Sequence, residues 1–566
     1  MASSTADEKA PAVPATPDEA HTIILRTLES GDVEAATALF ERASNRWPRQ
    51  PKLLLLKGDV LARQHGPAEA AFHYATLLDA NFGTWAANRL LSLLRENPLN
   101  FSDAEKLTRL IVEANAELKL KTPALDILVD RKDAAEREQL VQFLGLQSGI
   151  FRYEWKLAVH RAERGEFEGA LSILEEAQRH GRTTALSAAL MADLLALESR
   201  LPEAIELLES VRKQHADQPD IYRRLTMFLQ RAGEFERAAQ VFEDAARRWP
   251  HDWMLVHRLN RLPIRSRHLE QITEIISDGA EEALAKNDRF RFQFSLACLH
   301  AGKVERGFEL LRRPFQEPVA TMSVPVLKAL SARPLKDWTS GSRLKDDRTL
   351  EVQITRATDA RATIILLTGI AFGYLPLALV DTLFADHGLN VIYLRDFQRR
   401  AYLRGIATLG SSESETISAL AKLVDELGAK RTIAMGSSSG GFSALRCGAL
   451  IEADVAVSFS GPTLLGSVYD DTRVSVWNPD FFIKAILARE EALPIDLVPV
   501  LSQPLSTRFR QYYGADDTRD AKQASRLEGI PGVALYPTAD VSDHYVVDHM
   551  IGDGTFDTLL EELANG

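Results

Sequence analysis

Cysteine and clusters of basic residues are both scarce in this sequence. The 566 residues include only two cysteines, Cys298 and Cys447, which is too few for a disulfide framework or a cysteine-based zinc site. The 67 Lys and Arg are outnumbered by 79 Asp and Glu, and residues 341–566 alone hold 21 against 30. Because nucleic acids and anionic membranes are bound by clustered positive charge, neither is predicted as the main partner.

Long apolar runs and an apolar leader are also lacking. The eighteen residues from Thr363 to Val380 carry no charge, but Gly369, Gly373 and Pro376 interrupt them, so they predict a strand, a loop and the start of a helix rather than a membrane span. Residues 1–19 have no apolar core and no basic leader, and they are expected to be a disordered tail. A reducing, cytoplasmic location fits both the few cysteines and this tail.

A period of 34 residues is visible in the first half of the chain. The segments GEFEGALSILEEA, SRLPEAIELLESV and GEFERAAQVFEDA begin at Gly165, Ser199 and Gly233. Each places a small residue in the same phase, followed four and seven positions later by further apolar residues, which is the face of an amphipathic helix. The three small residues are Ala170, Ala204 and Ala238. A proline after Trp249 ends the unit, so each period predicts a helical hairpin.

This pattern resembles tetratricopeptide repeats, whose period is 34 residues. Similar segments near Ala36, Ala70, Ala104 and Gly302 extend the resemblance over residues 20–315. Stacked hairpins of this kind usually leave a groove that binds peptides or proteins, so the resemblance implies a protein partner. The alternative is an array that only packs against the rest of the chain.

Short apolar runs alternate with helical patterns in the second half. Residues 316–345 are rich in proline and turn residues and are predicted to be a linker. Within residues 346–566, seven runs read as strands: RTLEVQI, ATIILLTG, LNVIYLRDF, RTIAMG, ADVAVSFS, FRQYYG and VALYP. Strands that alternate with helices predict a mostly parallel sheet covered by helices, with its ligands at the carboxyl ends of the strands.

One strand, RTIAMG, runs directly into Gly436-Ser437-Ser438-Ser439-Gly440 and a helical pattern. This is G-x-S-x-G between a strand and a helix, where a tight turn exposes the hydroxyl of the central serine and glycines avoid clashes. Ser438 is therefore predicted to be a nucleophile. The alternative is a phosphate-binding loop, but the sequence has neither the lysine of a P-loop nor the G-x-G-x-x-G spacing.

A nucleophilic serine of this kind needs an acid and then a histidine later in the chain. His544 follows the last predicted strand directly and is the candidate base, whereas His549 falls within the next helical pattern and is predicted to be structural. The acid is expected after the strand FRQYYG, where Asp516, Asp517 and Asp520 stand. Asp517 is favoured because it lies three residues past Gly514, with Asp520 as the alternative acid or as a helix cap.

Together these residues resemble the α/β-hydrolase family over residues 346–566. The predicted fold class is thus an all-α solenoid followed by a three-layer α/β/α domain with a mostly parallel sheet. In that family two backbone N–H groups form the oxyanion hole, which implies Ser439 and one residue among Ile370, Ala371 and Phe372. Gly369 to Gly373 differ from the His-Gly of many members, so the second donor is open. No metal or organic cofactor is implied.

Two further segments could shape the site. Residues 461–507, with Trp477, Phe481 and Phe482, separate two of the strands and are predicted to form a cap. Arg395 and Arg399 follow a strand end and could bind an anionic group of a substrate, although runs of charge more often form a solvated helix face.

The sequence therefore predicts a serine hydrolase of the esterase or thioesterase type, with a repeat array that recruits a protein partner or mediates oligomerisation. Two alternatives remain open at this point. One is acyl transfer to a sugar or protein hydroxyl by the same residues, and the other is an inactive interaction scaffold.

Overall fold

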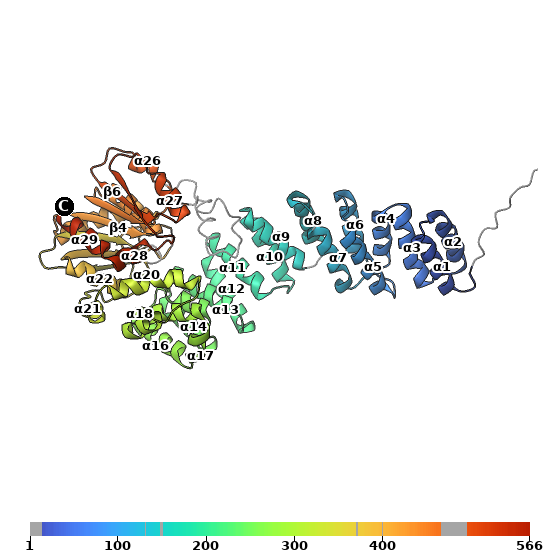
Figure 1. Cartoon of the computed structure of the whole chain (residues 1–566), viewed down its shortest axis with the longest axis horizontal. Helices are drawn as coiled ribbons and strands as arrows, with labels where there is room; N and C mark the ends of the chain where they lie inside the picture. The colour runs from blue at the N-terminus through green and yellow to red at the C-terminus, as the bar shows by residue number, and fades with distance from the viewer. Residues whose placement is uncertain (1–13, 131, 148–150, 369–371, 399, 466–494) are drawn as a thin grey trace, which may run out of the picture. The chain divides into compact units, whose positions relative to one another are not determined.

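The computed structural model describes residues 14–130, 132–147, 151–368, 372–398, 400–465 and 495–566. The chain divides into two compact units, Met1–Arg182 and Thr183–Gly566. Figure 1 labels many of the helices of both units and two of the strands, β4 and β6.

The first unit consists of paired helices. Neighbouring helices of a pair pack closely, as α9 does against α10 and α3 against α4. The helices are α1 (Pro17–Glu29), α2 (Val33–Arg46), α3 (Pro51–Gln64), α4 (Pro67–Thr76), α5 (Gly83–Glu96), α6 (Phe101–Glu113), α7 (Leu118–Asp130), α8 (Ala134–Gln147), α9 (Phe151–Glu163) and α10 (Phe167–Arg179).

The second unit begins with helices of the same pattern. They are α11 (Ala185–Leu197), α12 (Leu201–Gln214), α13 (Pro219–Arg231), α14 (Phe235–Arg248), α15 (Trp253–Leu259), α16 (Ser266–Ser277), α17 (Glu281–Lys286), α18 (Asp288–His300), α19 (Val304–Leu311), α20 (Val319–Ser331) and α21 (Leu335–Ser340).

The repeated small residues explain the pairing of these helices. Ala170, Ala204 and Ala238 lie in α10, α12 and α14 and are completely buried, so each lets the neighbouring helix approach. The turns before α10 and α14 use Gly165 and Gly233 with positive φ, where a Cβ atom is disfavoured. The predicted hairpins of the tetratricopeptide type are thus confirmed.

Residues 316–345, predicted to be a linker, include the helices α20 and α21. The indole of Trp338 in α21 is fully buried and donates from Nε1 to the carbonyl of Leu330 at 3.1 Å. One apolar cluster joins residues of α18, α19 and α20, such as Leu296 and Val326, to the sheet described below. The last repeat helices and the sheet therefore share a single core.

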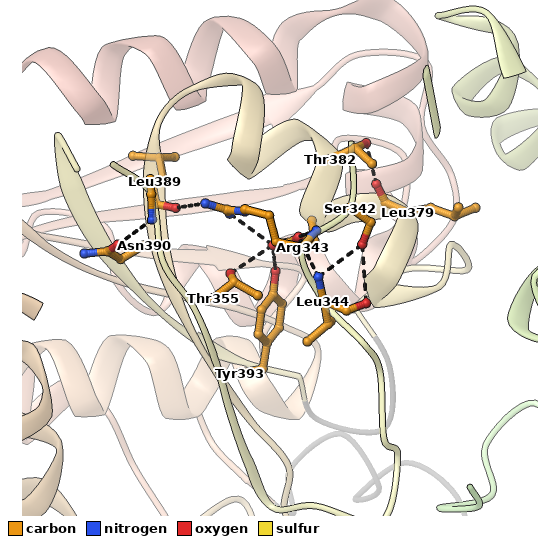
Figure 2. A network of polar contacts seen from close by, with 11 residues as sticks. Ser342, Arg343, Leu344, Thr355, Leu379, Thr382, Leu389, Asn390 and Tyr393 are labelled. Atoms are coloured by element: carbon orange, nitrogen blue, oxygen red, sulfur yellow. Dashed lines mark hydrogen bonds and ion pairs between the residues drawn. The ribbon is translucent and has the colours of Figure 1, made fainter. Parts of the chain in front are cut away.

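A buried carboxylate fastens the end of this segment to the sheet. Asp381 is completely buried and accepts hydrogen bonds from the backbone N–H groups of Arg343 and Leu344, at 2.7 and 3.0 Å, and from the Arg343 guanidinium at 3.1 Å. The hydroxyls of Thr355 and Tyr393 donate to it as well. Figure 2 shows Arg343, Leu344, Thr355 and Tyr393, whose hydrogen bonds converge on this carboxylate. A carboxylate with five donors is well compensated for its burial.

The described strands form one seven-stranded sheet in the order β1-β3-β2-β4-β5-β6-β7. Only β1 is antiparallel to its neighbour, so the predicted mostly parallel sheet is confirmed. The strands are β1 (Val352–Thr355), β2 (Ala362–Leu367), β3 (Leu389–Leu394), β4 (Thr432–Ser437), β5 (Val455–Phe459), β6 (Arg508–Gly514) and β7 (Val533–Thr538).

Helices cover both faces of the sheet because its central strands are apolar on both sides. Ile364 and Leu366 of β2 pack with α22, α28 and α29, whereas Ile365 and Leu367 pack with α23 and α24. Figure 1 shows α20 beside α28, with which it is in close contact. The helices are α22 (Leu377–Asp386), α23 (Glu413–Leu427), α24 (Ser439–Leu450), α26 (Val498–Leu501), α27 (Thr518–Ser525), α28 (Val546–Asp553) and α29 (Thr555–Asn565).

The uncharged segment from Thr363 to Val380 supplies most of β2 and the start of α22. Among the helices that the structure describes, none has the length and apolar character needed to cross a bilayer. Both cysteines are free and buried, Cys298 in α18 and Cys447 in α24.

Candidate active site at the carboxyl edge of the sheet

Ser438 is a one-residue turn between β4 and α24. Its φ of 56° and ψ of −129° lie outside the regions that residues with a side chain prefer, and such conformations cost roughly 1–3 kcal/mol. The turn is held because the N–H of Ser438 donates to the carbonyl of Phe459 at 2.9 Å, which extends the β4–β5 pairing by one residue. The tight turn predicted from G-x-S-x-G is therefore present at this serine, and it is strained.

Glycines permit this turn by removing side-chain atoms. A Cβ atom on Gly436 would lie 2.1 Å from the carbonyl oxygen of Gly440, and one on Gly441 would lie 2.4 Å from the Ser458 hydroxyl. Both distances are impossible for real atoms, so the close approach of β4, β5 and α24 requires glycine at these positions.

The N-terminus of α24 offers backbone donors beside Ser438. Ser439 is the first residue of the helix, and N–H groups of a first helical turn have no acceptor within the helix. The helix dipole adds partial positive charge at this end. Of the predicted second donors, Ile370 and Ala371 lie outside the described residues. The backbone of Phe372 is described, and its ring is buried against those of Phe459 and Phe556.

A histidine and a carboxylate meet at the same edge of the sheet. His544, in the loop between β7 and α28, has its Nδ1 2.8 Å from Oδ2 of Asp520 in the first turn of α27. The Asp520 side chain is 10% exposed and that of His544 is 30% exposed. The carboxylate of the pair is thus nearly buried, whereas the imidazole is partly accessible to solvent.

The aspartate favoured from the sequence, Asp517, does not face His544. It is the N-cap of α27, and its Oδ1 accepts from the N–H groups of Arg519 and Asp520 at 2.9 and 3.1 Å. Helix N-caps need such an acceptor, and it is Asp520, the alternative from the sequence, that is hydrogen bonded to His544.

The loops that carry this pair are fastened to each other. The N–H groups of Ala515 and Asp516 donate to the carbonyls of Thr538 and Val541 at 2.9 and 3.0 Å. A Cβ atom on Gly514 would lie 2.5 Å from the Val541 carbonyl oxygen. The acid loop and the histidine loop are therefore in direct backbone contact, which fixes the position of the imidazole.

His549 belongs to a separate pair. It lies in α28 and its Nε2 is 2.8 Å from Oδ2 of Asp543, with 21% of the His549 side chain exposed. This ring is partly buried and is bound to the turn before the helix, so His549 serves as a matched control for His544.

Asp548 was not singled out from the sequence, yet it anchors the chain that follows β2. It is completely buried, and both of its carboxylate oxygens accept from the N–H of Tyr374, at 3.1 and 3.0 Å. Burial raises the pKa of Asp548 to about 7, and hydrogen bonds from the backbone oppose that rise. Gly373 allows the approach, since a Cβ atom there would lie 2.7 Å from the carboxylate.

The ring of Tyr374 stacks on that of Tyr545, with centroids 3.9 Å apart. The segment after β2 is thereby fixed to the residue next to His544. In the sequence Gly373 indicates only a loop after the strand, and it does not identify Asp548 as the distant partner.

The remaining predicted residues are placed as follows. Arg395 is engaged in an ion pair with Asp346 and donates to Gln353 at 3.0 Å, so its guanidinium is already bound within the protein. Arg399 and the predicted cap residues Trp477, Phe481 and Phe482 lie outside the described residues. No group of His, Cys, Asp and Glu within the described ranges is arranged to hold a metal ion.

Comparison with known proteins finds no matching family model and no matching curated protein. Solved structures do match. An α/β-hydrolase enzyme from the metagenome of sediments of the Mar Chica lagoon, Morocco, is 20% identical and has a TM-score of 0.27, with 38% of this chain and 94% of that chain covered. A carboxylesterase structure from the thaumarchaeon Nitrososphaera gargenis is 18% identical, with 38% and 94% covered and a TM-score of 0.29.

A tetratricopeptide-repeat protein from Parabacteroides merdae is 19% identical, with 40% of this chain and 91% of that chain covered and a TM-score of 0.19. Repeat proteins of this type are thus structural neighbours of the helical part, and α/β hydrolases are neighbours of the part that contains the sheet.

Proposed function

We propose that this protein is a serine hydrolase that cleaves ester or thioester bonds with Ser438, His544 and Asp520. The observation that carries the proposal is the strained turn at Ser438, at the same sheet edge as the bonded pair of His544 and Asp520. Ser438 follows β4, Asp520 follows β6 and His544 follows β7, which is the chain order of a nucleophile, an acid and a base in such enzymes.

Each residue has a defined step. His544 takes the proton of the Ser438 hydroxyl on Nε2 while Asp520 accepts a hydrogen bond from Nδ1 and stabilises the imidazolium. The serine oxygen adds to the substrate carbonyl, and the N–H of Ser439 donates to the oxyanion that forms. The leaving group departs with the proton from His544, and water then releases the acyl group by the same steps.

The strain at Ser438 supports this assignment because it has no structural benefit of its own. A glycine at that position would adopt the observed φ and ψ without the penalty, so the serine is retained at a cost to stability. Conformations of this kind cluster at functional sites.

A fluorophosphonate probe tests the nucleophile directly. We expect covalent labelling of the folded wild type, none of Ser438→Ala, and strong reduction in His544→Ala. His549→Ala is the matched control, since it removes a partly buried histidine with its own carboxylate partner and should label like the wild type. A folded wild type that remains unlabelled would favour an inactive scaffold and contradict the proposal.

Hydrolysis and acyl transfer are separated by the fate of the acyl group. With an activated ester and increasing concentrations of a sugar or a serine-containing peptide, a hydrolase yields the free acid in constant amount. If the acceptor instead captures most of the acyl group, the enzyme is a transferase that uses the same residues.

We also propose that the repeat helices recruit a protein partner. The proposal rests on the confirmed hairpin pattern, because repeat arrays of this kind commonly bind peptides. Removing residues 1–182 should then leave cleavage of a small activated ester unchanged and slow the cleavage of an acylated protein substrate, if that substrate is the partner.

A further inference from the structure

A pocket of about 90 Å³ lies within the second unit, between repeat helices and the sheet. One wall comes from the ends of α13, α15 and α18, and the other comes from the chain beyond the carboxyl ends of β2 and β3. Neither Ser438 nor His544 is among its lining residues. The mechanism proposed above therefore does not account for it.

The pocket has a surplus of positive charge. Four arginines line it against two aspartates, Asp346 and Asp396. Asp346 is paired with Arg395, and one Asp396 oxygen accepts from the backbone N–H groups of Arg400 and Tyr402. The other three arginines are Arg231, Arg261 and Arg348.

Among the buried side-chain atoms of the pocket that lack a hydrogen-bond partner, donors also outnumber acceptors. Within the described part of the chain, Nε of Arg231, Nη1 of Arg348 and Nε2 of Gln230 are buried and have no acceptor. Gln230 is only 5% exposed. Among the described lining residues, Oδ1 of Asn260 is the one buried acceptor without a donor. An unsatisfied buried polar group destabilises the folded state, and a charged one does so more strongly.

The surroundings of the pocket disfavour the charged form of two of the arginines and of His300. Burial lowers the pKa of Arg348 to about 10, with Arg395 acting in the same direction and Asp346 opposing it. Burial, with Arg400 nearby, also lowers the pKa of Arg231. Burial and then Arg348 hold the pKa of His300 well below its usual range, so that ring is neutral at pH 7. An anion would relieve all three effects.

We propose that this pocket binds a small organic anion, with its phosphate or carboxylate group on Arg231, Arg348 and Gln230. Arginine is suited to such oxygens because its donors match them in pairs. Phe372, Leu375 and Leu377 supply an apolar part of the lining that fits the body of the ligand. Ser438 is not among the lining residues, and the proposal does not depend on the hydrolase chemistry.

The binding test uses the full chain carrying Ser438→Ala, so that no probe is turned over. Phenyl phosphate and benzoate are titrated calorimetrically, with benzyl alcohol as the neutral probe of similar size. We expect saturable binding of at least one anion, a rise in unfolding temperature with that anion, and no binding of benzyl alcohol. The two anions distinguish a phosphate from a carboxylate ligand.

Two substitutions locate the site. Arg231→Gln and Arg348→Gln should each weaken anion binding at least tenfold, whereas Arg356→Gln, an exposed arginine in the loop after β1, should bind like the parent. Arg348 also donates to the carbonyl of Asn260, so its loss could disturb folding. Among the described contacts, Arg231 lies 6.0 Å over the Phe228 ring and has neither a hydrogen bond nor an ion pair. Arg231→Gln should therefore unfold at or above the parent's temperature without anion.

Three results would overturn the proposal: no saturable binding of either anion, binding of benzyl alcohol as tight as that of the anions, or unchanged anion binding in a folded Arg231→Gln variant. Failure of the fluorophosphonate test would leave these expectations intact, because they do not involve the reaction at Ser438.

Discussion

At the scale of single residues, the carboxylate of Asp520 is hydrogen bonded to the imidazole of His544, while Asp517 caps α27, the helix that contains Asp520. Asp520→Asn should lower kcat by about 10²–10⁴-fold, because the imidazolium loses its counter-charge and the imidazole its tautomer. Asp517→Asn should change kcat little, since asparagine caps a helix about as well as aspartate. Steady-state kinetics on an activated ester, with unfolding temperatures for both variants, measure this difference.

Equal loss of activity in the two variants would contradict the assignment of Asp520. A larger loss in Asp517→Asn would return the acid role to that residue.

Asp548 gives a prediction about pH. Its pKa is about 7 in the folded protein against an ordinary 3.8, so the folded state holds the proton more tightly than the unfolded chain does. This contribution to stability is complete below pH 4 and is lost as the pH rises to about 7. Relative to Asp548→Asn, the wild type should lose on the order of 2–4 kcal/mol of unfolding free energy across that range.

Denaturant unfolding of both proteins between pH 4 and 8 measures the difference. Asp516→Asn, which removes an exposed carboxylate, is the control and should follow the wild type at every pH. Parallel curves for the wild type and Asp548→Asn would show that the pKa of Asp548 is the same in both states.

The proposed nucleophile and the proposed base could be predicted, because Ser438 is the central serine of G-x-S-x-G and His544 is the one histidine between the last strand and its helix. The acid could not. Asp516, Asp517 and Asp520 lie within five residues. Which one faces the histidine depends on where α27 begins, and helix boundaries are the least certain part of a sequence-based prediction.

At the scale of elements, equivalent turns of the repeat use different residues. Gly165 and Gly233 have φ of 81° and 75°, whereas Ser199 at the same phase has φ of 62° and carries a side chain. Gly233→Ala should cost roughly 1 kcal/mol, because an L residue is disfavoured in this region. Ser199→Gly should stabilise the protein by up to about 1 kcal/mol for the same reason.

Thermal unfolding of the full chain, followed by circular dichroism, measures both changes. Opposite signs are expected. A shift of the same sign in both variants would mean that contacts of the side chain, and not the backbone conformation, decide stability at these turns.

The strands could be predicted from short apolar runs between turn residues, and all seven are present. The helix α20 could not, because Pro325 stands inside it and prolines surround it. Pro325 is buried, and its neighbours Val326 and Ala329 belong to the shared core. Packing against α28 thus outweighs the poor helix propensity of this segment. The local sequence reveals the propensity but not the packing, so the helix could not be predicted from it.

At the scale of the whole chain, the compact units do not follow the boundary between repeats and sheet. The second unit starts at Thr183, and α18, α19 and α20 contribute to the same core as β2 and α28. Residues 183–566 should therefore fold and react with the fluorophosphonate probe. Residues 346–566 should aggregate or remain unlabelled, because removal of those helices exposes the apolar surface that they cover.

Expression of both fragments, with circular dichroism and probe labelling, measures this outcome. A well-folded, fully reactive 346–566 fragment would show that the repeat helices are dispensable for the core.

The buried cysteines give chemical access to two parts of the second unit. Burial raises the pKa of both thiols, Cys298 in α18 and Cys447 in α24, to about 12, so almost none is thiolate at neutral pH. A thiol reagent can therefore modify either one only when the surrounding structure opens. One cysteine samples the repeat helices and the other the sheet domain. Equal modification rates, each measured with the other cysteine replaced by alanine, would mean that both parts open in one concerted event.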